Sequence, residues 1–175
     1  MLDTKSVSEL ASKLNPDCII ALDVIIDAHI LPTNPLEQIG LLLNLQDLSI
    51  DYFGEAKYLA PSHMLPLKNL KRVRCLKIYN LHLSPMLTDE DFVSMAENWP
   101  ELEILEISSQ FLNISRLSTT SLTSLGKHCP RLEDLSIVGV GEYDLNDWQN
   151  IPRPVFPQLR RLFIGDLIDS KGETQ

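Results

Sequence analysis

The chain has 175 residues, of which 44% are hydrophobic and 22% are charged, a composition typical of one folded domain with its own core. Its formal net charge of −9 repels the phosphate backbone of nucleic acid, so we expect no nucleic-acid partner. No apolar run reaches the roughly 18 residues of a membrane span, so we also expect no membrane partner.

The cysteines and the first residues indicate a compartment. Cys18, Cys75 and Cys129 are odd in number and widely spaced, which favours neither a disulfide framework nor a zinc site. The N-terminal residues lack the apolar centre of a secretory signal. We therefore expect a reducing compartment, cytoplasmic or nuclear.

Two helix starts and two strands are predicted within the first 53 residues. Residues 6–14 begin with Ser-Val-Ser-Glu, a capping sequence that predicts a helix. Asn34 followed by Pro35 predicts a second helix, because the missing N–H of proline costs nothing in the first turn. The segments 19–24 and 45–50 carry apolar residues at alternate positions, which is typical of short strands.

The middle of the chain continues the alternation of strands and connecting segments. Residues 54–70 contain two prolines and are expected to form loops or single turns. Strands are predicted over 73–78 and 102–107. Between them, Thr88 and an acidic first turn predict a helix that Pro100 ends. One face of that helix is apolar: Phe92, Met95, Ala96 and Trp99.

The last third of the chain repeats this order. A helix is predicted to end at Cys129-Pro130, and strands follow over 132–137 and 159–164. The segment 141–158 between these strands contains three prolines and is expected to run as a loop.

One pattern, apolar-x-x-Leu-x-(Ile/Val), occurs six times. Its central leucines lie 26 to 30 residues apart, which leaves room for a crossover segment and predicts that neighbouring strands are parallel. The Leu and Ile/Val of each motif share the buried face of a strand. The central leucines are Leu22, Leu48, Leu76, Leu105, Leu135 and Leu162.

Three junctions between a connecting segment and a strand are more specific than this spacing. Each joins a cysteine or an aromatic residue to proline and continues at once into the leucine motif: Trp99-Pro100, Cys129-Pro130 and Phe156-Pro157. This resembles the cysteine-containing leucine-rich repeats of fungal F-box-like proteins. The resemblance implies an α/β, right-handed solenoid with a parallel sheet on its concave side and irregular helices and loops on its convex side. Residues 1–169 would form one domain of about six repeats, followed by a disordered tail over 170–175.

The same resemblance implies substrate recognition in a ubiquitin-ligase context. The F-box, the helical module that contacts the ligase adaptor, has no candidate here, because residues 1–18 are too short for it. An adaptor would therefore be bound only through a module absent from this chain. The Asn or Cys that normally follows each strand in the family is also missing, so we expect irregular turns.

The concave face is the expected binding site. In each strand, the residues that alternate with the core leucine point to this face. Five of them are apolar or aromatic, namely Ile25, Tyr79, Ile104, Val138 and Phe163, which is typical of an interface rather than a solvated sheet. We expect a protein partner to contact Asp47, Lys77, Tyr79, Ile104, Glu106, Asp134 and Phe163.

Two other functions remain open at this point. The last strand lies near the end of the sequence, so the chain could be a structural, self-associating fragment of a longer leucine-rich-repeat protein. A hydrolase is the third interpretation, but no motif supplies a nucleophile with its base. We therefore expect a non-catalytic protein with no catalytic residue.

No metal or cofactor site is expected. The acids of residues 89–91 are consecutive in a helix and point in different directions, so they cannot converge on one ion. Residues 139–141, Gly-Val-Gly, lack the third glycine of a dinucleotide loop. Cys18 and Cys129 are interpreted as small core residues, and Cys75 as exposed on the concave face.

Overall fold

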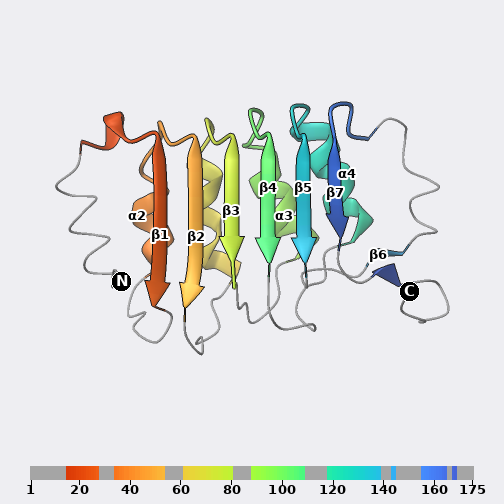
Figure 1. Ribbon diagram of the computed structural model, residues 1–175, viewed down its shortest axis with the longest axis horizontal. Coiled ribbons are helices and arrows are strands. Elements are labelled where there is room, and N and C mark those ends of the chain that lie inside the picture. The colour runs from red at the N-terminus through yellow and green to blue at the C-terminus, as the bar shows by residue number, and fades with distance from the viewer. Residues whose placement is uncertain are drawn as a thin grey trace.

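The computed structural model describes residues 15–27, 34–53, 61–80, 88–108, 118–138, 143–144, 155–164 and 167–168. Its centre is an all-parallel sheet of six strands in sequential order, which places the chain in the α/β class (Figure 1). The strands are β1 (Ala21–Asp27), β2 (Asp47–Phe53), β3 (Cys75–Tyr79), β4 (Ile104–Ser108), β5 (Asp134–Val138) and β7 (Arg161–Ile164). Two short strands, β6 (Tyr143–Asp144) and β8 (Leu167–Ile168), pair separately and also in parallel.

The helices cover one face of this sheet. Three α-helices lie behind the strands in Figure 1: α2 (Pro35–Ile39), α3 (Asp89–Ala96) and α4 (Thr119–His128). Three short 3-10 helices complete the described elements: η1 (Pro16–Cys18), η3 (Pro61–His63) and η4 (Leu65–Asn69). The prediction of single turns over 54–70 is therefore confirmed for the described part of that segment, 61–70.

All six strands lie where the leucine motif predicts them, and their parallel pairing is confirmed. The central leucines are partners of one another from strand to strand, so the predicted register is also correct. Leu48, Leu76, Leu105 and Leu135 are at most 1% exposed against the helix layer. Leu162 in the last strand is an exception: it was expected in the core but is 47% exposed, because β7 is an edge strand.

Each strand start is tied to the preceding one by the same two backbone hydrogen bonds. The carbonyl just ahead of a strand accepts the N–H groups of two successive residues at the next strand start, with N–O distances of 2.7 to 3.1 Å. This arrangement occurs five times, beginning at the Ile20 carbonyl and ending at the Glu133 carbonyl. Side chains at equivalent positions of neighbouring repeats are therefore brought side by side.

The predicted helix caps are present. The side chain of Asn34 accepts the N–H of Leu36, with Pro35 in the first turn of α2. Thr88 and Asp91 form a reciprocal capping box at the start of α3. The helix predicted over 6–14 lies outside the described residues, as does the tail over 170–175.

Hydrogen bonds also join one repeat to the next within the helix layer. The Asp89 carboxylate, in the first turn of α3, accepts the N–H and hydroxyl of Ser118 and the hydroxyl of Ser121 at 2.5 to 2.8 Å, at the start of α4. The buried Trp99 donates its indole N–H to the carbonyl of Leu67 at 3.0 Å. These bonds satisfy polar groups that burial would otherwise penalise.

Three details of the sequence interpretation were wrong. Helix α3 ends at Ala96, ahead of Pro100, because Glu97 and the residues after it turn away while Trp99 fills the core. Cys18 is exposed in η1 rather than buried, whereas Cys129 is buried as expected. The pairing of β6 with β8 was not predicted, because a strand of two residues leaves no periodicity to detect.

Candidate binding surface on the open face of the sheet

The open face is the side of the sheet opposite α2, α3 and α4. Strand register arranges its side chains in columns that run across neighbouring strands, as predicted. The first column contains Ala21, Asp47, Cys75, Ile104, Asp134 and Arg161. The second contains Asp23, Ser49, Lys77, Glu106, Ser136 and Phe163. The third includes the aligned Ile25, Asp51 and Tyr79, and the aligned Ser108 and Val138.

Three residues predicted as contacts form one cluster at the centre of this face. Glu106 on β4 receives the hydroxyl of Tyr79 at 2.5 Å and pairs with the Lys77 ammonium at 3.0 Å, both from β3. Glu106 is thus held by two donors from the neighbouring strand. The cluster fixes three side chains on a surface that water reaches, which limits the entropy a partner would have to remove on binding.

The electrostatics of this cluster follow from those contacts. Partial burial and the hydrogen bond to Glu106 raise the pKa of Tyr79 to about 12, so its phenol remains a donor at neutral pH. Burial raises the pKa of Glu106, but the hydrogen bonds from Tyr79 and Lys77 outweigh it, and the net pKa is lowered. The hydrogen bond to Glu106 raises the pKa of Lys77.

A second ion pair lies at the β5–β7 end. Arg161 on β7 contacts the carboxylate of Asp134 on β5 through a hydrogen bond and an ion pair. Asp134 is buried beneath this exposed guanidinium. Both residues belong to the first column, so the contact follows from the register.

The β1–β2 end of the open face carries the carboxylates of Asp23, Asp47 and Asp51. Asp51 accepts a hydrogen bond from the amide of Asn80 at 2.7 Å. Asp23 and Asp47 are exposed and make no hydrogen bond or ion pair within the described residues. The three columns hold five carboxylates against Lys77 and Arg161, a charge of −3 that is concentrated at this end.

Among the described residues, the most exposed apolar side chains of the open face lie on β1, at the end of β2 and on β7. Ile25 on β1 is 52% exposed and Phe163 on β7 is 61% exposed, as expected. The expectation was wrong in degree for Ile104, Tyr79 and Val138, which are only partly exposed. Ile104 lies between Cys75 and Asp134 of the adjacent strands. Phe53, 58% exposed at the end of β2, was missed, although its place two residues after Asp51 assigns it to the same face.

The remaining candidate groups are accounted for by structure. The carboxylate of Asp89, one of the three consecutive acids in residues 89–91, accepts hydrogen bonds from Ser118 and Ser121. Among the described residues, no group of three His, Cys, Asp or Glu side chains could hold a metal ion. Cys75 lies partly exposed on the open face, and burial raises the pKa of its thiol. Residues 139–141 lie outside the described part of the chain.

None of the helices in the described ranges combines the length and hydropathy that crossing a bilayer requires. In comparisons with known proteins, neither a protein-family model nor a curated protein sequence matches this chain.

Proposed function

We propose that this chain is a leucine-rich-repeat solenoid that binds a protein partner on its open face and performs no chemistry of its own. One observation carries this proposal: none of the described helices covers the open face of the six-stranded sheet, which has exposed apolar and aromatic side chains at its ends and an ion pair at its centre. Such surfaces suit protein recognition, because rigid side chains lose little entropy and exposed aromatic residues supply contact area.

The proposed context is substrate recognition for a ubiquitin ligase of the F-box type, in the cytoplasm or the nucleus. Support comes from the cysteine- or aromatic-proline junctions that lead directly into the leucine motifs beginning at Leu102, Leu132 and Leu159. Contact with the ligase adaptor would be made by a module other than these repeats. The repeats would select the target and hold it.

Affinity capture from source-cell extract, followed by mass spectrometry, tests the proposal when matched variants are compared. Tyr79→Ala combined with Phe163→Ala should abolish recovery of the partner while leaving the far-UV circular dichroism unchanged. The control replaces two exposed apolar residues outside the strands, Leu41 and Leu43, with alanine and should retain the partner. Equal recovery by all three proteins would contradict binding through the open face.

The ligase context has its own readout. When the captured partner is added to a ubiquitination reaction together with a ligase adaptor and the protein that carries these repeats, modification of the partner supports recruitment. A partner that binds the open face but is never modified would contradict the ligase context without affecting the binding proposal.

A second candidate function is self-association through β7. Leu162, which occupies the position of the buried central leucines, is 47% exposed, and Phe163 beside it is 61% exposed. An edge strand with apolar residues on both faces favours pairing with another strand. Light scattering over a concentration series should then show a rise in mass that Leu162→Glu removes and Leu43→Glu does not. A constant monomer mass would contradict this candidate.

A further inference from the structure

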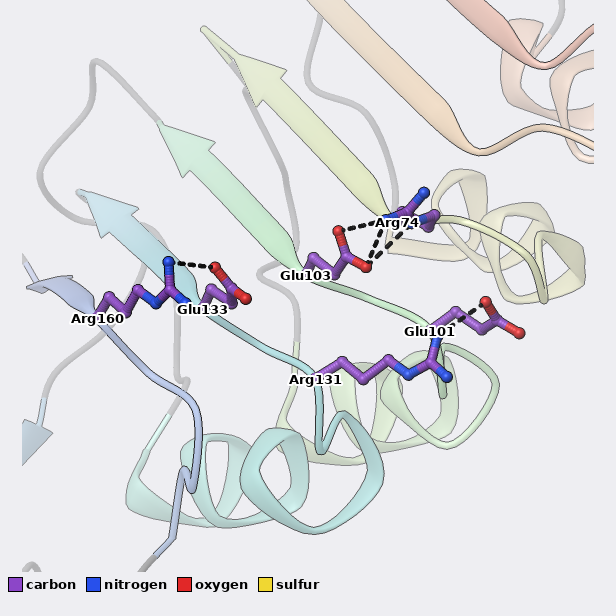
Figure 2. Close-up of polar contacts among 6 residues, drawn as sticks. All are labelled: Arg74, Glu101, Glu103, Arg131, Glu133 and Arg160. Atoms are coloured by element: carbon purple, nitrogen blue, oxygen red, sulfur yellow. Dashed lines mark hydrogen bonds and ion pairs between the residues drawn. The ribbon is translucent and has the colours of Figure 1, made fainter.

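The edge of the sheet where the strands begin is lined by charged side chains of both signs. Arg74 binds Glu103, Arg131 binds Glu101 and Arg160 binds Glu133, each pair joining neighbouring repeats (Figure 2). These side chains are adjacent because the paired carbonyl and N–H contacts align equivalent positions from repeat to repeat. We call this group, together with Gln46 and Arg72, the strand-entry edge.

An open hollow of about 470 Å³ lies within the strand-entry edge. Its lining residues are all polar or charged and come from the segments that precede β2, β3, β4 and β5: Gln46, Arg72, Arg74, Glu101 and Arg131. Three guanidinium groups therefore surround a space of a size that holds an amino-acid side chain. In a chain of net charge −9, this is a local concentration of positive charge.

The three arginines differ in how firmly they are held. Arg74 donates three hydrogen bonds to Glu103 at 2.7 to 3.0 Å, so its guanidinium is held in one orientation and is not free to bind another group. Arg131 is held by one longer contact to Glu101, at 3.3 Å, between side chains that are both about half exposed. A pair of this kind contributes little and exchanges readily for another partner.

Arg72 has no carboxylate partner among the described residues. One of its terminal nitrogens donates to the amide oxygen of Asn44 at 2.9 Å, which orients the guanidinium. Its other donors are left for a ligand. Glu103 and Asp47 both act on Arg74, and Glu101 pairs with Arg131, so the uncompensated positive charge of the hollow lies at Arg72.

We propose that this hollow binds a single carboxylate group of a protein partner, with Arg72 and Arg131 as the residues that contact it. A singly charged carboxylate matches the one lining arginine that lacks a carboxylate partner among the described residues, Arg72. The planar guanidinium fork matches a carboxylate in two parallel hydrogen bonds, as the Arg74–Glu103 pair already does. This site is separate from the open face and does not depend on the function proposed for that face.

The test is an NMR titration with small probes on the intact chain. N-acetyl-glutamate N-methylamide carries one side-chain carboxylate, and N-acetyl-glutamine N-methylamide is its neutral counterpart. The carboxylate probe should shift the Nε–Hε signals of Arg72 and Arg131 with a Kd on the order of 1 mM. The neutral probe should leave them in place. Equal shifts with both probes, or none with either, would overturn the proposal.

A third probe separates the two sources of such a carboxylate. N-acetylglycine presents the carboxylate of a chain terminus without a side chain. Tighter binding of the glutamate probe supports an acidic side chain as the ligand, and tighter binding of N-acetylglycine supports a C-terminal carboxylate. Both outcomes support a carboxylate site.

Variants on the same edge identify the contacts. Arg72→Gln should weaken the glutamate probe by about tenfold, the effect of losing a charge-assisted hydrogen bond. Glu101→Gln should strengthen binding several-fold, because it frees Arg131, and a purely structural role for Glu101 would not produce this gain. Arg160→Gln, which breaks the pair with Glu133 outside the hollow, is the matched control and should leave the Kd unchanged. An unchanged Kd for Arg72→Gln, or weaker binding by Glu101→Gln, would contradict the assignment.

Discussion

The two faces of the sheet are built from alternate residues of the same strands, yet their side chains differ in kind. Against the helices lie leucines that water does not reach, such as Leu76 and Leu105. One residue away, on the open face, Lys77 and Glu106 form an ion pair within reach of water. The buried packing of the sheet and the surface proposed for binding are therefore separated by a single step along the chain. Substitutions on the two faces should have different consequences.

The largest expected effect is on the covered face. Leu105→Ala leaves a cavity beneath β4 and should lower the free energy of unfolding by about 3 kcal/mol. Its neighbour Ile104 faces the other way and is partly exposed, so Ile104→Ala should cost about 1 kcal/mol or less. Urea unfolding measures both values. Similar losses for the two variants would contradict the separation of the faces.

The helix layer should show the next largest effect. Asp89→Ala removes the acceptor of three hydrogen bonds that join α3 to α4, and we expect a loss of about 2 kcal/mol. Glu90, exposed beside it in the same helical turn, is the matched control and should tolerate alanine. Thermal unfolding midpoints compare the two variants. If both midpoints fall by the same amount, the hydrogen bonds to Ser118 and Ser121 do not contribute to stability.

Alkaline pH distinguishes the faces through two tyrosines. Burial raises the pKa of Tyr52 on the covered face, and partial burial raises that of Tyr79 on the open face to about 12. An unfolded tyrosine titrates near about 10, so the stability that each neutral phenol contributes is complete below that pH and is lost as pH rises toward the folded pKa. Between about pH 10 and pH 12 both folded phenols stay neutral, so Tyr52→Phe and Tyr79→Phe should each remove a similar part of this loss. Above about pH 12, Tyr52→Phe should remove more, because Tyr52 is buried and ionises later.

Urea midpoints measured below and above about pH 10 provide the comparison. At neutral pH, Tyr52→Phe should not destabilise the protein, because no hydrogen-bond partner of its hydroxyl is found in the described residues. A larger alkaline effect for Tyr79→Phe would reverse the expected order.

The smallest effect is expected at the centre of the open face. Glu106→Gln keeps the shape of the side chain but removes the charge that pairs with Lys77. Because water reaches this pair, the unfolding free energy should change by no more than about 1 kcal/mol. Partner binding, measured by capture, should fall more than stability does. A large loss of stability would assign the cluster a structural role instead.

The strands, their parallel order and their register could be predicted because one short pattern recurs at nearly constant spacing. Each Leu-x-(Ile/Val) motif fixes which face of its strand is buried, and matching the motifs fixes the register. The helix caps at Asn34 and Thr88 were equally local signals. The columns of the open face follow from the register alone.

What the sequence did not indicate depends on contacts between distant residues. The ion pairs of the strand-entry edge join side chains 27 to 30 residues apart and become neighbours only after the repeats stack. The exposure of Leu162 depends on its edge position, which the motif itself does not encode. The partial burial of Ile104 and Tyr79 likewise depends on the neighbouring strands.

The register of β3 and β4 underlies every surface described above, and one substitution tests it. Cys75 pairs directly with Ile104 across these parallel strands. Neighbouring strands lie about 4.8 Å apart, within the range of Cα–Cα separations that a disulfide spans. On oxidation, Ile104→Cys should form a disulfide with Cys75, detected by peptide mass spectrometry, whereas Glu106→Cys, two residues further along β4, should not. If the cross-link forms only in the Glu106→Cys protein, or in neither, the strands do not pair as described and the open face does not exist in this form.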